Sequence, residues 1–234
     1  GVGFRPDAII FVSPFSTALT DVKADQALLG VGFAVAPTAS RSVSMNSIDA
    51  QAAANTTYAQ SATVAITSPA GTEQASLVSM DSDGFTLNWS ATENEDNVFA
   101  LCLRGGLYKL GSFTQPLEAS SVATTGIGFR PKGLIMLSAN SATEAVPGDT
   151  AKMSIGAASS ATARHAIWAG DLDAADPMVT GVRMDNDQVF FMMTPAAASN
   201  TLNAEADFTS FDADGFTLNW ETADAVARVV IYLA

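Results

Sequence analysis

Cysteine and histidine are almost absent from this chain of 234 residues, which contains one of each, Cys102 and His165. A single cysteine excludes an intramolecular disulfide, and one cysteine with one histidine leaves no zinc-ligand cluster. No G-x-S-x-G or H-E-x-x-H motif accompanies them, so a histidine-dependent triad would have to be built around His165 alone. We expect Cys102 to be a small buried hydrophobe and His165 to be a surface or loop residue.

Positive charge is also scarce. The chain has 11 lysine and arginine residues against 24 aspartate and glutamate residues, which gives a formal net charge of −13 at pH 7. This charge repels nucleic-acid phosphate and anionic lipid, so we exclude nucleic acid and membranes as partners. Charged residues make up only 15% of the chain, against about 25% in an average soluble domain. Such a surface suits a protein that packs against copies of itself or against a neighbour.

Long apolar runs and long helical periodicity are missing. No segment approaches the roughly 18–20 continuous apolar residues of a transmembrane helix, and no signal peptide is visible. Short apolar runs lie between glycine and proline residues instead, a pattern typical of an all-β sandwich or barrel. Only the alanine-rich pieces at 50–54 and 196–206 could form a turn or two of helix.

One unit of sequence is written twice. Residues 81–89 read D-S-D-G-F-T-L-N-W and residues 212–220 read D-A-D-G-F-T-L-N-W, while G-V-G-F-R-P at the start of the chain returns as G-I-G-F-R-P from residue 126. We therefore predict two tandem homologous β-sandwich (jelly-roll-like) domains. The first module is placed at residues 1–105 and the second at 106–234, with 106–125 as a linker or as the first strand of the second module.

The repeated motifs also predict which residues are buried. After each Asp-Gly hairpin turn, apolar and polar residues alternate, so one face of the strand should meet the core. The residues expected on that face are Phe85, Leu87 and Trp89 in the first copy and Phe216, Leu218 and Trp220 in the second. Runs without alternation are expected to be central strands covered on both faces. They occupy residues 8–12, 98–103, 133–137 and 229–234.

The two copies differ in their connecting segments. Residues 107–114 have strand-like character but no counterpart before Gly1. Either the second unit has an extra strand or the opening strand of the first unit is missing, and we favour the latter because the chain does not begin with methionine. The second copy has five extra residues between Pro195 and Asp214, which predicts an exposed loop at 196–206. Asp-Asn-Asp at 185–187 is interpreted as a hairpin turn.

The polar residues kept in both copies have two interpretations each. The D-x-D-G segments at 81–84 and 212–215 are interpreted as turns, although clustered carboxylates also suit a calcium ion. Arg5 and Arg130 should have fixed partners, for which Asp83 and Asp214 are candidates, or could anchor another subunit. We predict no catalytic, cofactor-binding or metal-binding residues.

The paired signatures G-[VI]-G-F-R-P and D-x-D-G-F-T-L-N-W, with the closing run V-V-I-Y-L-A, resemble tailed-bacteriophage and prophage virion structural proteins that have tandem β-rich modules. The resemblance covers both copies and implies a structural role on the surface of a phage particle. It carries no catalytic residues.

The expectation that follows is a head decoration (cement) protein, not an enzyme, that stabilises the capsid by protein–protein contacts. Its partners would be the major capsid protein or other virion proteins, and it would form a homo-oligomer. An alternative is a tail-fibre or adhesin module that binds host surface glycans through a patch near Trp168 or Asn200. A third option is a glycan hydrolase, which would need two carboxylates flanking a cleft.

Overall fold

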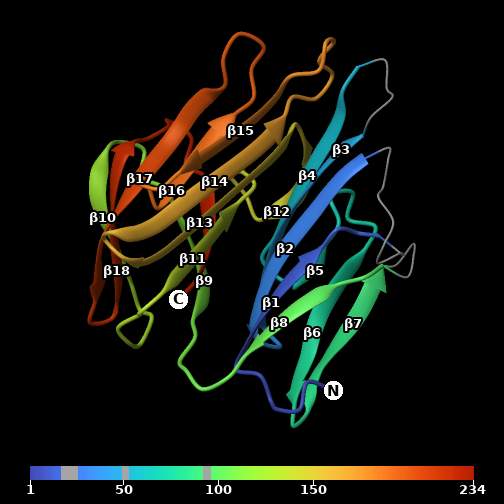
Figure 1. Ribbon diagram of the computed structural model, residues 1–234, viewed down its shortest axis with the longest axis vertical. Coiled ribbons are helices and arrows are strands. Elements are labelled where there is room, and N and C mark those ends of the chain that lie inside the picture. Colours follow the sequence, from blue (N-terminus) through green and yellow to red (C-terminus); the bar gives the residue numbers. More distant parts are fainter. Residues whose placement is uncertain (17–25, 49–52, 92–95) are drawn as a thin grey trace.

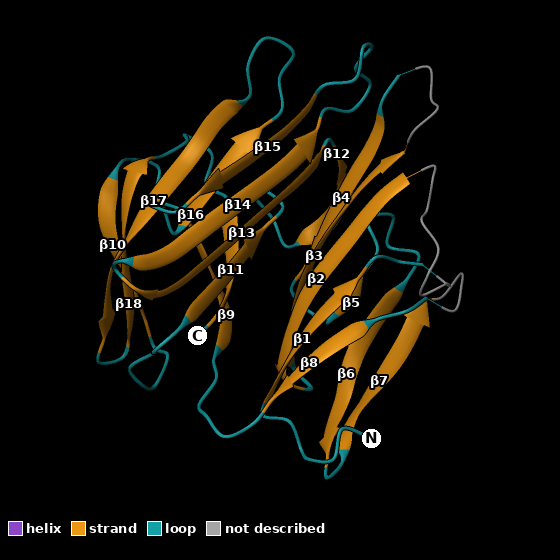
Figure 2. Ribbon diagram, viewed as in Figure 1, coloured by secondary structure: helices purple, strands orange, loops and turns teal. Residues whose placement is uncertain are grey.

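The computed structural model of this protein describes residues 1–16, 26–48, 53–91 and 96–234. The regular secondary structure in these ranges is entirely β-strand, arranged in four antiparallel sheets (Figure 1, Figure 2). The all-β sandwich class predicted from the short apolar runs is therefore confirmed. No helix within the described ranges is long and apolar enough to cross a membrane.

The first module has one large sheet and one small sheet. The large sheet runs in the order β4-β3-β2-β1-β8, with β1 (Ala8–Ser13), β2 (Gln26–Ala36), β3 (Ala39–Ile48), β4 (Asn55–Ser61) and β8 (Phe99–Leu103). The small sheet runs β5-β6-β7, with β5 (Ile66–Thr67), β6 (Gln74–Asp81) and β7 (Gly84–Ala91). The D-x-D-G turn joins β6 to β7, as predicted from the sequence.

The second module is built the same way and carries more strands. Its large sheet runs β15-β14-β13-β11-β19-β9, with β9 (Leu110–Thr114), β11 (Leu134–Ser138), β13 (Ala151–Ser160), β14 (Ala163–Asp171), β15 (Thr180–Asp185) and β19 (Val229–Leu233). Its small sheet runs β10-β18-β17-β16, with β10 (Ser120–Thr125), β16 (Phe190–Thr194), β17 (Thr201–Asp212) and β18 (Gly215–Thr222). Strands β9 and β10 come from the segment between the two copies, and both pair within the second module.

The two modules share one topology. The order β4-β3-β2-β1-β8 of the first large sheet corresponds to β15-β14-β13-β11-β19 in the second, and β5-β6-β7 corresponds to β16-β17-β18. In each module a meander forms the large sheet, the chain crosses to the small sheet, and the last repeated strand returns beside the first. The duplication seen in the motifs thus extends over the whole strand order.

A glycine retained in each large sheet shows how closely the two sheets of a module approach. A Cβ atom on Gly32 would lie 1.9 Å from the carbonyl oxygen of Ala65, and one on Gly156 would lie 2.0 Å from the carbonyl oxygen of Val189. In both modules the backbone that enters the small sheet therefore passes directly over a residue that can have no side chain.

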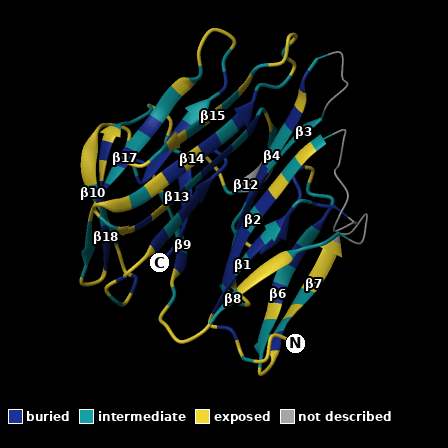
Figure 3. Ribbon diagram, viewed as in Figure 1, coloured by how far each residue is buried: buried dark blue, intermediate teal, exposed yellow. Residues whose placement is uncertain are grey.

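Four apolar clusters form within the described ranges, and the three largest join the sheets and the modules. Buried residues are dark blue in Figure 3. One lies between the sheets of the first module and includes Phe11 and Leu77. Another lies between the sheets of the second module and includes Phe216. The third joins the modules, because it combines residues such as Val43 of β3 with Ile231 of β19. Successive strand residues point to opposite faces, so this third cluster lies on the outer faces of the two large sheets.

Strand β12 (Ala145–Asp149) connects the two modules. It belongs to the sequence of the second module but pairs with β4 at the edge of the first large sheet. Beside it, the buried Gln60 side chain bridges the modules. Its Oε1 accepts a hydrogen bond from Ala139 N (2.8 Å), and its Nε2 donates to the Val229 carbonyl (3.4 Å). An ion pair between Arg41 and Glu144 also crosses this boundary.

Three sequence predictions about these elements were wrong. The run at 98–103 is an edge strand, because no described strand corresponding to β9 lies beside β8. The segment 196–206 is only partly loop and has no helix, since β17 begins at Thr201 and small side chains such as Ala206 fit the core. The turn at 185–187 joins strands of different sheets, so it is a crossover and not a hairpin. Residues 50–52 of the other alanine-rich piece lie outside the described ranges.

Candidate functional site

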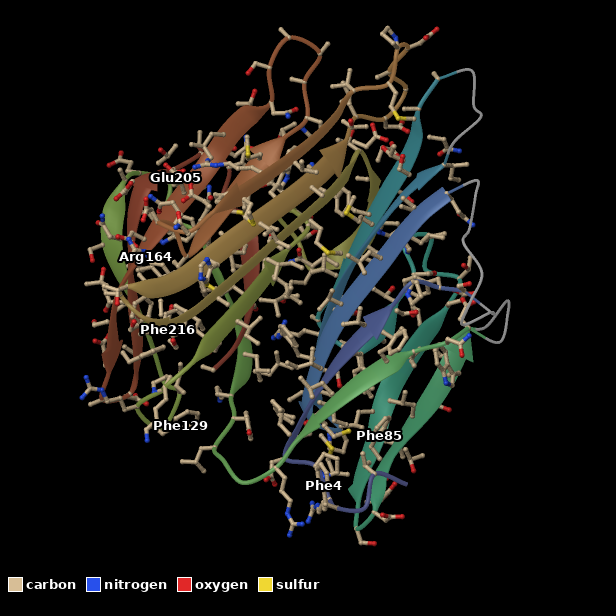
Figure 4. All side chains as sticks on the ribbon, in the orientation of Figure 1. Phe4, Phe85, Phe129, Arg164, Glu205 and Phe216 are labelled. Atoms are coloured by element: carbon tan, nitrogen blue, oxygen red, sulfur yellow. The ribbon has the colours of Figure 1, made fainter. Side chains whose placement is uncertain are left out.

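The two repeated motifs contact each other in both modules. In the first module, Asp83 Oδ1 accepts a hydrogen bond from Gly3 N at 2.7 Å, and in the second, Asp214 Oδ1 accepts one from Gly128 N at 2.5 Å. Figure 4 labels one phenylalanine of each motif, Phe4, Phe85, Phe129 and Phe216. The second aspartate of D-x-D-G therefore ties the G-x-G loop to the hairpin turn, which explains why the motifs recur together.

The first aspartate of each D-x-D-G turn is bound within its own hairpin. Asp81 accepts hydrogen bonds from Ser79 Oγ (2.6 Å) and Thr86 Oγ1 (2.7 Å), and Asp212 receives the two equivalent bonds, both at 2.7 Å. The serine and then the threonine hydrogen bond hold the pKa of each carboxyl below its ordinary value. Within the described ranges, no three or more His, Cys, Asp or Glu side chains gather where they could hold a metal ion. These contacts favour the turn interpretation over a calcium loop.

The expected ion pairs of Arg5 with Asp83 and of Arg130 with Asp214 are not formed among the described residues. The reason is geometric. Glycines with positive φ, such as Gly3 at 81°, turn their amides toward the carboxylate and occupy its oxygens. The arginines are left at the loop surface.

A groove of about 870 Å³ lies between the connecting segment and the outer face of the second large sheet. Its lining includes Tyr108, Arg130, Lys132 and His165, and none of the residues that line it is an aspartate, glutamate or cysteine. His165 is exposed, as predicted. The pairing registers make it the equivalent of Arg41 in the first module. The side chains that line the groove therefore give it a basic and apolar character.

Charged side chains also gather where the large and small sheets of the second module meet (Figure 4). Arg183 binds Glu205 (2.7 Å) and Asp185 (2.8 Å), and Arg164 binds Asp207 (2.5 Å). The backbone N–H of Asp187 donates to Asp185 and, together with the Arg183 guanidinium, holds the pKa of Asp185 below its ordinary value. Because Arg164 and Arg183 stand on the large sheet and bind Asp207 and Glu205 of the small sheet, this cluster ties the two sheets together.

The tryptophans are placed differently from what their motifs predict. Trp220 is buried as expected, but Trp89, at the equivalent position, is 38% exposed. In the second module, Phe113 of β9 covers Trp220 at a ring distance of 6.4 Å, and the described part of the first module has no such strand. Trp168 is buried against Phe191, so it cannot stack on a sugar ring at the surface.

The open side of the first module also affects Cys102. This residue points into the core beside β1 but is only half-buried, because β8 is an edge strand. Partial burial raises the pKa of its thiol. Its role as a small hydrophobe matches the expectation, although it is less covered than predicted.

Exposed apolar side chains on the outer sheet faces are the functional feature that sequence reasoning missed. They stand on β8 (Phe99 and Leu101) and on β15 (Val182 and Met184), and Figure 3 shows β8 as an exposed strand. The sequence did contain one indication of these exposed residues. In T-G-V-R-M-D at 180–185, Val182 and Met184 alternate with Arg183, and in the structure Arg183 faces inward while the two apolar residues face outward. Clusters of large apolar side chains at a surface mark sites where proteins meet.

Comparison with models of known protein families, with curated proteins and with solved structures found no match for this chain.

Proposed function

We propose that this protein is a structural component of a tailed-phage particle, a head decoration (cement) protein that binds the outside of the capsid and stabilises the shell. Its partners are the major capsid protein or other virion proteins, together with further copies of itself. It acts by assembly and not by catalysis. The motif resemblance noted above supplies the phage setting.

The main support is a contrast between the retained polar residues, which are hydrogen-bonded within the chain, and the apolar side chains that are exposed on the outer faces of the sheets. Each retained aspartate is bound to backbone or to a hairpin hydroxyl, and the modules are joined by β12 and by a shared apolar cluster. Most of the large apolar side chains that remain exposed stand on strands of the sheets. Such surfaces suit contact with other proteins more than capture of a small substrate.

The mechanism is burial of apolar surface at junctions between subunits. Removal of this surface from water favours the assembled state, and an interface of about 1,200–2,000 Å² would give a stable contact. Each bound copy would then bridge neighbouring capsid subunits, so that separating them would expose the buried area again.

The test is to add purified protein to capsids that lack it. We expect it to co-sediment with the shells and to raise their melting temperature, because a ligand that binds only the assembled shell stabilises it. An unrelated protein of similar size and negative charge serves as the control. If the protein leaves bare shells unbound and their melting temperature unchanged, the proposal is wrong.

The second candidate, a tail-fibre or adhesin module that binds host glycans, has one supporting observation. The groove beside the connecting segment includes the ring of Tyr108, which could stack on a sugar. A glycan array that gives a clear signal, lost in Tyr108→Ala, would favour this function over capsid decoration.

A further inference from the structure

The strand pairings align the two large sheets residue by residue. Gly32 pairs with Phe11 and with Ser42, and Gly156 pairs with the corresponding residues Met136 and Ala166. The alignment continues along every strand of the repeat. A position in one module can therefore be compared directly with its equivalent in the other.

Within the chain, the two modules use different parts of this shared face. The first module contributes positions on β3 and β4, namely Val43, Tyr58 and Gln60. The second module contributes positions on β13 and β19, namely Met153, Ile231 and Leu233. The contact is mainly heterologous, because β3 and β4 of the first module lie against β13 of the second. The central strands also contribute from both sides, with Ile10 and Val31 in the first module and their equivalents Ile135 and Ile155 in the second.

The equivalents of the first set are exposed on the second module. The position of Val43 is taken by Ile167, and the positions of Tyr58 and Gln60, which pair with β3, are taken by Val182 and Met184. These three apolar residues are 46%, 85% and 82% exposed, respectively. We call Ile167, Val182 and Met184 the β15 face.

The equivalents of the second set are exposed on the first module. Leu29 stands where the second module has Met153, Phe99 where it has Ile231, and Leu101 where it has Leu233. These residues are 38%, 60% and 58% exposed, whereas their equivalents in the second module are at most 5% exposed. We call Leu29, Phe99 and Leu101 the β8 face.

We propose that a second copy of this chain covers these faces, with the β15 face of one copy packed on the β8 face of the next. This contact repeats between chains the packing that joins the two modules within a chain. Each copy offers one face of each kind, so the copies join head to tail. Such a contact forms a closed ring if the rotation between copies closes, and an open filament if it does not.

The internal repeat is what identifies the occupant. Each exposed face carries the equivalents of residues that pack together inside the same molecule, and the face that would complete the contact is exposed on every other copy. Only the part of the internal interface made by β9 has no equivalent among the described residues of the first module. A two-fold contact of β8 face with β8 face would not reproduce the packing seen between the modules. Continuity with the existing interface therefore favours a second copy in a head-to-tail arrangement.

Net charge sets the conditions for association. Each copy carries a formal charge of −13, so copies repel one another at low ionic strength. Salt screens this repulsion, since the Debye length falls to about 10 Å at 0.1 M. We expect association to strengthen as salt is added, which is the behaviour of an apolar contact between like-charged proteins.

The head-to-tail contact specifies how the copies named in the proposed function would meet, and it can be tested without a capsid. A protein that failed to associate with itself could still decorate a capsid, and self-association would not by itself establish a capsid partner. The two proposals therefore fail in different experiments.

The test uses two double variants studied by analytical ultracentrifugation over a range of concentrations and salt. Phe99→Asp with Leu101→Asp removes the β8 face, and Val182→Asp with Met184→Asp removes the β15 face. We expect the unmodified protein to associate and each double variant to be monomeric alone. An equimolar mixture of the two variants should form dimers of one copy each, because each variant retains the face that the other has lost.

Two controls keep the result interpretable. Val226→Asp changes an exposed apolar residue outside both faces and should associate like the unmodified protein. Circular dichroism checks the fold, and the β15 variant is the safer one because both of its substituted side chains are more than 80% exposed. The proposal is overturned if the unmodified protein stays monomeric up to about 1 mM at high salt. It is also overturned if the mixed variants stay monomeric or if either double variant still associates alone.

Discussion

The same nine-residue motif sits in two different environments, and this difference gives a sharp prediction about stability. Trp220 is 2% exposed, and Phe113 packs against it, whereas Trp89 is 38% exposed at an open sheet edge. We compare Trp220→Ala with Trp89→Ala. Because the surrounding sequences are nearly identical, each variant is the matched control for the other.

The expected magnitudes follow from burial. Replacing a fully buried tryptophan by alanine costs about 3–5 kcal/mol in the free energy of unfolding, since it removes buried apolar area and leaves a cavity. For Trp89, the covered part of the side chain is worth roughly 2 kcal/mol at about 25 cal/mol per Å². Water can enter the open edge, so no closed cavity adds to that cost. Trp220→Ala should therefore be the more destabilising change by roughly 2 kcal/mol.

The assay is urea unfolding followed by circular dichroism at constant protein concentration. A third variant, Phe113→Ala, removes the ring that covers Trp220, and the double variant Phe113→Ala with Trp220→Ala completes a cycle. We expect the coupling between the two rings to be about 0.5–1.5 kcal/mol. Equal costs for Trp89→Ala and Trp220→Ala would refute the claim that β9 makes the difference between the modules.

Other predictions test the sheet contacts, the module junction and the acidic turns. Gly156→Ala should destabilise by about 1–3 kcal/mol, because the added methyl group meets a backbone carbonyl, while Gly133→Ala has free space and should stay within about 0.5 kcal/mol in a thermal melt. Gln60→Leu leaves a buried amide of the other module unpaired and should cost about 1–3 kcal/mol in urea unfolding. Ser210→Ala removes the main contact that lowers the pKa of Asp212, so that pKa should rise toward 3.8 in an NMR titration. Because the folded-state pKa is depressed, the stability from this contact is present above the ordinary aspartate pKa and is lost as pH falls through the lowered value; an unchanged pKa in the variant would contradict the assignment.

The sequence predicted the features of the fold that depend on local chemistry. An Asp-Gly turn followed by alternating residues specifies a hairpin wherever it occurs, so β6–β7 and β17–β18 were foreseen in both copies. The internal match then gave the duplicated topology. Periodicity also chose the correct face for Trp89, since Phe85 and Leu87 on the same face do pack against the first core.

What the sequence did not predict depends on which strand lies next to which. The motif around Trp89 does not indicate whether another strand lies beside β7 or β8. In the second module β9 and β10, which come from outside the repeat, pair with the equivalent strands, and no described strand does so in the first. The pairing of Arg5 with Asp83 failed for a similar reason. Their opposite charges suggested an ion pair, but the carboxylate of Asp83 accepts a hydrogen bond from the backbone N–H of Gly3, a glycine with positive φ. The exposed β8 and β15 faces became visible only when equivalent positions of the two modules could be compared.

Comparison of Gln60 with its equivalent Met184 is the strongest argument that the β15 face is covered by another protein surface and not by water. Gln60 is polar and almost completely buried, and its side chain bonds to the backbone of the other module. Met184 is apolar and 82% exposed at the matching site. If water alone covered Met184, the polar residue would be expected at the exposed position and the apolar one at the buried position. The observed order is the reverse. A neighbour that presents an apolar surface rather than free backbone groups accounts for it, and Phe99 and Leu101 of another copy provide such a surface.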